Sequence, residues 1–143
     1  MVIRMDVWIS ITGVKQEGGD SEKIEMVTAG RMEEDGDGYR LTYEETEATG
    51  MAGVVTSLHV NEREVLLQHS GASNTLLVLE KGRRHLCSYE TGYGSLMMGV
   101  YTRSIRTTLH RDGGELDLQY TMDINAGMTS THDIHIAVRP LLS

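Results

Sequence analysis

The chain has 143 residues, and its 13 basic and 21 acidic side chains give a formal net charge of −8, which argues against nucleic acid as a partner. This length fits one domain that buries its own core, and we expect that domain to span residues 1–143. Cys87 has no second cysteine to pair with, and no apolar run approaches a signal peptide or the ~20 residues of a membrane helix, so we expect a cytoplasmic protein without a membrane partner.

The first third of the chain predicts three strands through two-residue alternation. Residues 3–11 are apolar at every odd position, which places Trp8 on the opposite face. The same pattern recurs at 24–28 and at 39–45, where Glu45 continues the face formed by two tyrosines and a leucine. Polar, glycine-bearing segments separate these runs and predict turns.

Four shorter strands are predicted in the middle of the chain. Residues 54–60 and 65–69 alternate clearly, with a hairpin turn between them. Residues 75–80 are apolar on both parities, so the inward face of that strand is left open. In the fourth run, 85–91, Tyr89 is expected to face inward.

The last third predicts a long hairpin and a final strand. Two extended runs meet at Asp112-Gly113-Gly114, where glycine permits the positive φ of a tight turn. In the first run, Leu96, Met98, Val100 and Thr102 lie at even positions, whereas Ile105 and Leu109 lie at odd positions. One extra residue flips every later side chain, so this change predicts a β-bulge at Arg103-Ser104.

These elements amount to about ten antiparallel strands, with no segment of helical period longer than one turn. Strands with one apolar face must close on themselves or pack as two sheets. We therefore predict an all-β protein, a single closed up-and-down β-barrel of about eight to ten strands. A two-sheet sandwich with long crossovers is the alternative.

Several short motifs carry a family resemblance. They are, in chain order, Tyr39-Arg-Leu-Thr-Tyr-Glu-Glu45, Ser70-Gly-Ala72, Tyr89-Glu-Thr-Gly-Tyr-Gly94, the run Val100 to Leu109, and Gly114-Glu-Leu-Asp-Leu-Gln-Tyr120. Together they resemble the YwiB-like family of uncharacterised bacterial proteins. The resemblance implies a lipocalin-like (calycin) barrel in the bacterial cytoplasm, but it brings no activity and no site residues.

Polar residues on the inward faces are the candidates for a ligand-binding site, because a buried polar atom without a partner costs ~1–3 kcal/mol. Glu45 is the sharpest candidate, since a buried carboxylate needs a cation or hydrogen-bond donors. The alternative is that Glu45 lies in water at the barrel mouth, and that the histidines are interior or rim residues with their own partners. The candidates are Glu45, His69, Tyr43, Tyr89, Thr102 and His132.

The His132-x-x-His135 spacing does not predict a local metal site, because residues three apart on a strand point to opposite faces. His69, His132 and Glu45 could still meet in space. We expect no metal and no cofactor. Cys87 reads as a small buried apolar group rather than a nucleophile.

Three hypotheses for function follow, and the first is favoured. The barrel binds a small apolar or amphipathic ligand in its interior. Alternatively, a filled barrel serves as a protein-interaction scaffold or homodimer through Trp8, Val27 and Val55 on its outer face. An enzyme using Glu45 with a histidine ranks last, because no arrangement of nucleophile, base and orienting group is recognisable and no catalytic residue is assigned.

The chain contains no phenylalanine and nine methionines. Methionine fills irregular space, so a methionine-rich interior would suit a promiscuous pocket. We favour the simpler interpretation that methionine, leucine and tyrosine replace phenylalanine as core volume.

Overall fold

The computed structural model describes residues 4–46, 52–71, 74–91, 93–125 and 127–141. All of its regular elements are strands, and no helix that could cross a membrane is found in these ranges. The strands are β1 (Arg4–Glu17), β2 (Asp20–Asp35), β3 (Gly38–Glu44), β4 (Val54–Val60), β5 (Glu64–Gly71), β6 (Thr75–Glu80), β7 (Arg84–Thr91), β8 (Gly94–Thr107), β9 (Gly114–Ile124) and β10 (Met128–Pro140).

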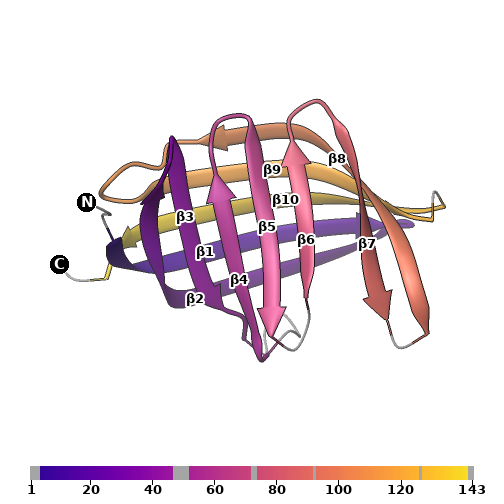
Figure 1. The fold of residues 1–143 in the computed structure, drawn as a ribbon, viewed down its shortest axis with the longest axis horizontal. Helices are drawn as coiled ribbons and strands as arrows, with labels where there is room; N and C mark the ends of the chain where they lie inside the picture. The colour runs from indigo at the N-terminus through magenta and orange to yellow at the C-terminus, as the bar shows by residue number, and fades with distance from the viewer. Residues whose placement is uncertain (1–3, 47–51, 72–73, 92, 126, 142–143) are drawn as a thin grey trace.

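The ten strands form one antiparallel sheet in the order β6-β5-β4-β3-β2-β1-β10-β9-β8-β7. Consecutive strands pair with each other except β6 and β7, and the first strand also pairs with the last, so β1 and β10 lie inside the sheet rather than at its edges. The sheet curls round, and β3–β6 cross in front of β1, β9 and β10 (Figure 1). This confirms the predicted all-β, closed antiparallel barrel and excludes the two-sheet sandwich.

The seam of the barrel lies between β6 and β7, which are consecutive but form no ladder. The turn between them holds the seam at one end. There Gly82 N donates to Thr102 O at 2.8 Å, and Lys81 forms an isolated parallel β-bridge with Thr102. The two strands diverge from this turn (Figure 1). The barrel is therefore nearly closed, with hydrogen bonding across the seam concentrated at the turn.

Strict alternation along the strands creates the core. On β9, Leu116, Leu118 and Tyr120 are buried, as the two-residue period predicts. On β1 the odd positions Val7 and Ile9 are buried. The interior is therefore a continuous apolar cluster drawn from the inward positions of the barrel strands.

Pairing resolves the strand whose register the sequence left open. On β6, Leu77 pairs with Leu67 of β5 and is buried together with Leu79. Leu76 is instead exposed on the outer face. Tertiary pairing decides the inward face here, because the strand is apolar on both sides.

The predicted β-bulge is confirmed in β8. The register against β9 shifts between Thr102 and Ser104, so Thr102 and Ile105 are both buried although their parities differ. Where the chain enters β9, Gly113 and Gly114 have φ of 123° and 126°. A Cβ on Gly113 would lie 2.3 Å from the carbonyl oxygen of Val138, so this turn needs glycine for space as well as for φ.

We predict that Leu116→Ala lowers the free energy of unfolding by about 2–5 kcal/mol, because it opens a cavity at a fully buried position. Leu86→Ala is the matched control, since that leucine is 60% exposed on β7. Urea unfolding of the two variants checks the prediction. Equal losses of stability would contradict the assignment of inner and outer faces.

Candidate ligand cavity

A cavity of about 280 Å³ lies inside the barrel. Its wall is drawn from both halves of the sheet and is largely aliphatic. The apolar lining includes Leu58 of β4, Leu67 of β5, Leu79 of β6, Leu118 of β9, and Ile134 and Ile136 of β10. The curled sheet therefore surrounds a partly open space bounded mainly by hydrocarbon.

One polar row crosses this wall through strand pairing. Tyr43 of β3 pairs with Thr56 of β4, Thr56 with His69 of β5, and His69 with Thr75 of β6. Residues paired in this way project from the same face of the sheet. The row therefore sets a phenol, an imidazole and two hydroxyl groups side by side.

Glu45 joins this row immediately after β3 ends, where its amide donates to Val54 O at 2.8 Å. The hydroxyl of Thr56, which is fully buried, donates to Oε2 of Glu45. His69 Nδ1 lies 3.1 Å from Thr75 Oγ1. The carboxylate is thus held by the next strand and is only partly exposed.

The surroundings keep the other groups of the row uncharged. Burial, followed by the charge of Glu45 and a hydrogen bond to it, raises the pKa of Tyr43 far above its ordinary value, so the phenol remains protonated. Burial lowers the pKa of His69, and the negative charge of Glu45 opposes this only in part. Glu45 therefore faces a neutral phenol and, near pH 7, a neutral imidazole.

A second polar row crosses the opposite half of the barrel. Thr102 of β8 pairs with Tyr120 of β9, Tyr120 with His132 of β10, and His132 with Lys15 of β1. The rings of Tyr120 and His132 are stacked, with centroids 4.7 Å apart and an interplanar angle of 6°. His132 Nε2 also lies 2.9 Å from Ser130 Oγ.

The second row is also neutral apart from its last member. Burial, and then the positive charge of Lys15, lower the pKa of His132, while Glu17 opposes the shift. Burial raises the pKa of Tyr120 to about 12. Lys15 is the charged group of this row, and it lies at the end of the barrel nearest the β1–β2 turn.

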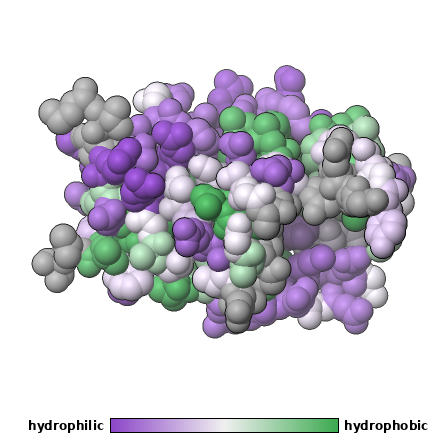
Figure 2. Space-filling model, turned by 60° about the horizontal axis from the view of Figure 1, so that its bottom comes forward, coloured by the Kyte–Doolittle hydropathy of each residue, from purple (hydrophilic) through white to green (hydrophobic). Residues whose placement is uncertain are grey.

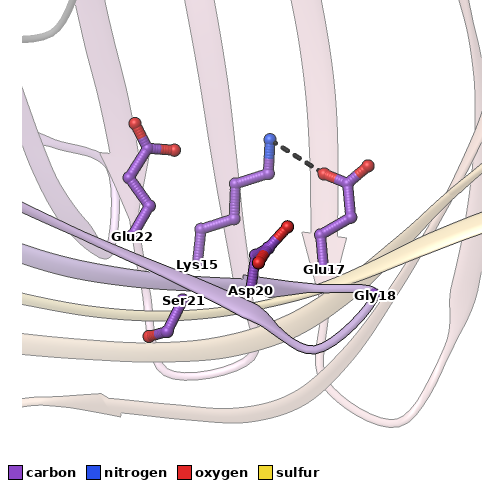
Figure 3. A pocket seen from close by; sticks show the side chains of 6 residues that line it. All are labelled: Lys15, Glu17, Gly18, Asp20, Ser21 and Glu22. Carbon is purple, nitrogen blue, oxygen red and sulfur yellow. Dashed lines mark ion pairs between the residues drawn. The ribbon is translucent and has the colours of Figure 1, made fainter.

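Lys15 also lines a second, outer hollow of about 460 Å³ at the β1–β2 hairpin. There Lys15 Nζ pairs with Glu17 Oε2 at 3.3 Å, and Glu22 of β2 projects alongside them (Figure 3). Asp20 contributes a third carboxylate. The barrel cavity therefore shares a lining residue with a predominantly acidic hollow.

Four of the six candidate residues line the cavity: Tyr43, Glu45, His69 and His132. Thr102 is fully buried, but it is not part of this lining and its backbone holds the seam. Tyr89 lies on β7 opposite Leu96, and its side chain lies outside the described residues. The structure thus brings together residues from β3, β5 and β10 that are distant in sequence.

Three further residues of the site were not among the sequence candidates: Lys15 and Tyr120, which line the cavity, and Thr56, which holds Glu45. The inward parity of β1 extends to Lys15, but a lysine near a turn is usually exposed. Thr56 lies on the inward parity of β4, where threonine reads as an ordinary strand residue. Tyr120 reads as core. Its stacking on His132 depends on a pairing that the sequence does not specify.

Within the described ranges, no group of three or more His, Cys, Asp or Glu side chains is arranged to hold a metal ion. His135 faces away from His132 and contacts Asp117 at 2.7 Å, as expected for residues three apart on a strand. Cys87 is half-buried against the core, and burial raises the pKa of its thiol. A raised pKa keeps the thiol protonated and poorly nucleophilic.

These observations define the class: an all-β protein whose single antiparallel sheet closes round an internal cavity. The chain belongs to the family described as a domain of unknown function, DUF1934, whose model matches residues 9–136.

The comparisons with individual proteins agree with this family. The chain is 26% identical over 130 residues to the uncharacterized beta-barrel protein YwiB of Bacillus subtilis (strain 168), covering 91% of this chain and 90% of that protein. It also resembles the crystal structure of the ywiB protein from Bacillus subtilis with a TM-score of 0.83 and 25% identity, covering 96% of this chain and 92% of the other. The resemblance drawn from the sequence motifs is confirmed.

We predict that the rings of His69 and His132 titrate below the ordinary histidine pKa of 6.5, and that His135 titrates above it because Asp117 accepts a hydrogen bond from its ring. As the pH falls below about 6.5, His69 and His132 take up protons more readily in the unfolded chain than in the folded protein. These two residues therefore lower the free energy of unfolding as the pH decreases. NMR titration of the assigned imidazole signals checks the order. Either cavity histidine titrating above His135 would contradict it.

Proposed function

We propose that the protein binds a small, partly apolar molecule inside the barrel. The observation that carries this proposal is the internal space of about 280 Å³, bounded by aliphatic side chains and by two polar rows. Its volume lies just below the ~300–1,000 Å³ that is typical of small-molecule sites. The size favours a compact ligand over a long lipid chain.

The same space argues against the filled-barrel alternative. Interiors normally pack to crystal-like density, whereas the side chains of this barrel leave a space among leucines and isoleucines, whose inward surfaces lack protein contacts on that side. A ligand with an apolar body would restore those contacts. Its polar groups would meet Tyr43, Glu45, His69 and His132, which supply both donors and acceptors.

The enzyme hypothesis has weaker support. His69 contacts Thr75, and His132 contacts Ser130, so each imidazole has a hydroxyl partner. A nucleophilic site also needs a group that orients the base and donors for the developing charge. The contacts of the described residues do not assemble such a set around either ring.

We also propose that the protein works in the cytoplasm. Cys87 is its only cysteine and is a free, half-buried thiol. A fold that uses no disulfide suits a reducing compartment.

The cavity can be blocked from within. Gly13 of β1 lines it, and a Cβ at this position would have no neighbour closer than 4.0 Å. We predict that Gly13→Val folds, because valine favours strands, and that it abolishes binding by filling the space. Thr12→Val, one residue along the same strand on the opposite face, is the matched control.

The measurement is an NMR titration with benzyl alcohol and with benzylamine, following the methyl signals of Leu58, Leu67 and Leu79. We expect saturable shifts in the wild type and in Thr12→Val, and none in Gly13→Val. The proposal fails if neither compound shifts these signals in the wild type. It also fails if Gly13→Val binds as the wild type does.

A second proposal concerns the outer face of β1 and β2, where the protein would form a homodimer. Val27 is 61% exposed and Trp8 is 37% exposed. They lie diagonally across the β1–β2 ladder, since Trp8 pairs with Ala29 and Val27 with Ser10. Val55, the third outward candidate, lies on β4 and is partly buried.

We predict that light scattering detects a concentration-dependent dimer at micromolar protein and that Val27→Glu abolishes it, because a buried unpaired charge disfavours the interface. The measurement is needed because exposed apolar residues are also common on monomers. On the face that carries the β3–β4, β5–β6 and β7–β8 connections, hydrophobic areas are small and scattered among hydrophilic ones (Figure 2). A strict monomer for the wild type would exclude this proposal.

A further inference from the structure

We propose that the ligand carries a positively charged amine that binds the carboxylate of Glu45, with its apolar body held by the leucines deeper in the barrel. This inference rests on the proposed binding function and names the chemical class of the ligand. It is drawn from the partners of Glu45, the position of Lys15, and the order of polar and apolar residues along β4 and β5.

Among the described residues, Glu45 has hydrogen-bond donors but no cationic partner. Its donors are the hydroxyl of Thr56, which is fully buried, and the phenol of Tyr43, whose hydrogen bond to Glu45 helps to keep it protonated. The ion pairs formed within the described part of the chain do not include Glu45. A carboxylate that loses water on ligand binding needs a counter-charge more than another neutral donor.

His69 supplies a second acceptor beside the carboxylate. Its pKa is lowered by burial, so the imidazole is neutral near pH 7. In the tautomer in which Nδ1 donates to Thr75 Oγ1, Nε2 has a free lone pair. An ammonium group has three N–H donors, which Glu45 and His69 can share.

The apolar part of the ligand has a defined place. Leu58 and Leu67 pair with each other across β4 and β5, two residues after Thr56 and two residues before His69. Both leucines line the cavity. The row that holds Glu45 is therefore followed directly by an aliphatic layer, as a molecule with one charged head and one apolar body requires.

Lys15 is the group that could favour an anion instead. Its side chain is 43% exposed and is already paired with Glu17 at 3.3 Å. The hollow beyond it is lined by three carboxylates, those of Glu17, Asp20 and Glu22, against this one cation (Figure 3). Lys15 is therefore compensated whereas Glu45 is not, and the acidic hollow beside the cavity repels an anion and attracts an amine.

The test compares three probes that share one ring and differ in the head group: benzylamine, benzyl alcohol and benzoate. Each is titrated at about pH 7.5, where the amine is protonated and the two imidazoles are neutral. Methyl NMR shifts of Leu58 and Leu67 report the dissociation constants. Two variants accompany the wild type, Glu45→Gln, which keeps an acceptor for Thr56, and Glu44→Gln, which removes the exposed carboxylate next to it in sequence.

We expect benzylamine to bind at least about tenfold more tightly than benzyl alcohol, with benzoate the weakest, because a charge-assisted hydrogen bond is added at Glu45. Glu45→Gln should abolish the difference, and Glu44→Gln should retain it. The inference is overturned if benzyl alcohol or benzoate binds as tightly as benzylamine, or if the preference survives in Glu45→Gln. In those cases the cavity still binds a ligand and the proposed function stands.

The two proposals fail differently. If none of the three probes shifts the cavity signals, the binding function fails and this inference fails with it. If Glu45→Gln does not fold, the ranking of the three probes on the wild type decides the matter alone, because they occupy nearly equal volumes.

Discussion

The ladder between β1 and β10 is the constraint on which the rest of the structure depends. It pairs the two ends of the chain from Val7 with Pro140 to Gln16 with Thr131. Closing so long a loop costs chain entropy, which is offset by burying the inward residues of both strands, such as Ile9 and Ile136. The same register places Lys15 beside His132 and so completes one wall of the cavity.

The interior accommodates polar groups because most of those described find side-chain partners, either on a neighbouring strand or on the same strand. Thr56 donates to Glu45, His69 contacts Thr75, and His132 contacts Ser130. Thr102 is the exception, since its fully buried hydroxyl has no partner among the described residues, an arrangement that costs about 1–3 kcal/mol. Its backbone closes the seam, so the residue is fixed by main-chain bonds rather than by its side chain.

Much of the fold could be predicted from local patterns. Alternation located the strands, and the phase change between Thr102 and Ile105 located the bulge, because both are properties of neighbouring residues. The position of the seam could not be predicted, since it depends on β1 pairing with β10. Inward parity found four cavity residues but missed Lys15 and Thr56, whose roles come from residues on other strands.

The structure supports the interpretation that methionine serves as core volume in this chain. Met26 and Met32 are buried in the core, and Met5, Met98 and Met122 pack against it. None of the residues that line the cavity in the described ranges is a methionine. The apolar part of the cavity wall consists mainly of branched aliphatic side chains with few rotamers, which suits a preformed pocket better than an adaptable one.

The position of the chain ends has a topological consequence. Leu141 N donates to Asp6 O at 3.0 Å, so the start of β1 and the end of β10 are neighbours at one rim of the barrel. A short peptide joining them, with a cut at Lys81-Gly82, would convert the strand order into a plain meander running from one side of the seam to the other. The fold is in this sense a circular permutant of the simplest up-and-down barrel. The chain is interrupted between β1 and β10, in the middle of the sheet, instead of at the seam between β6 and β7.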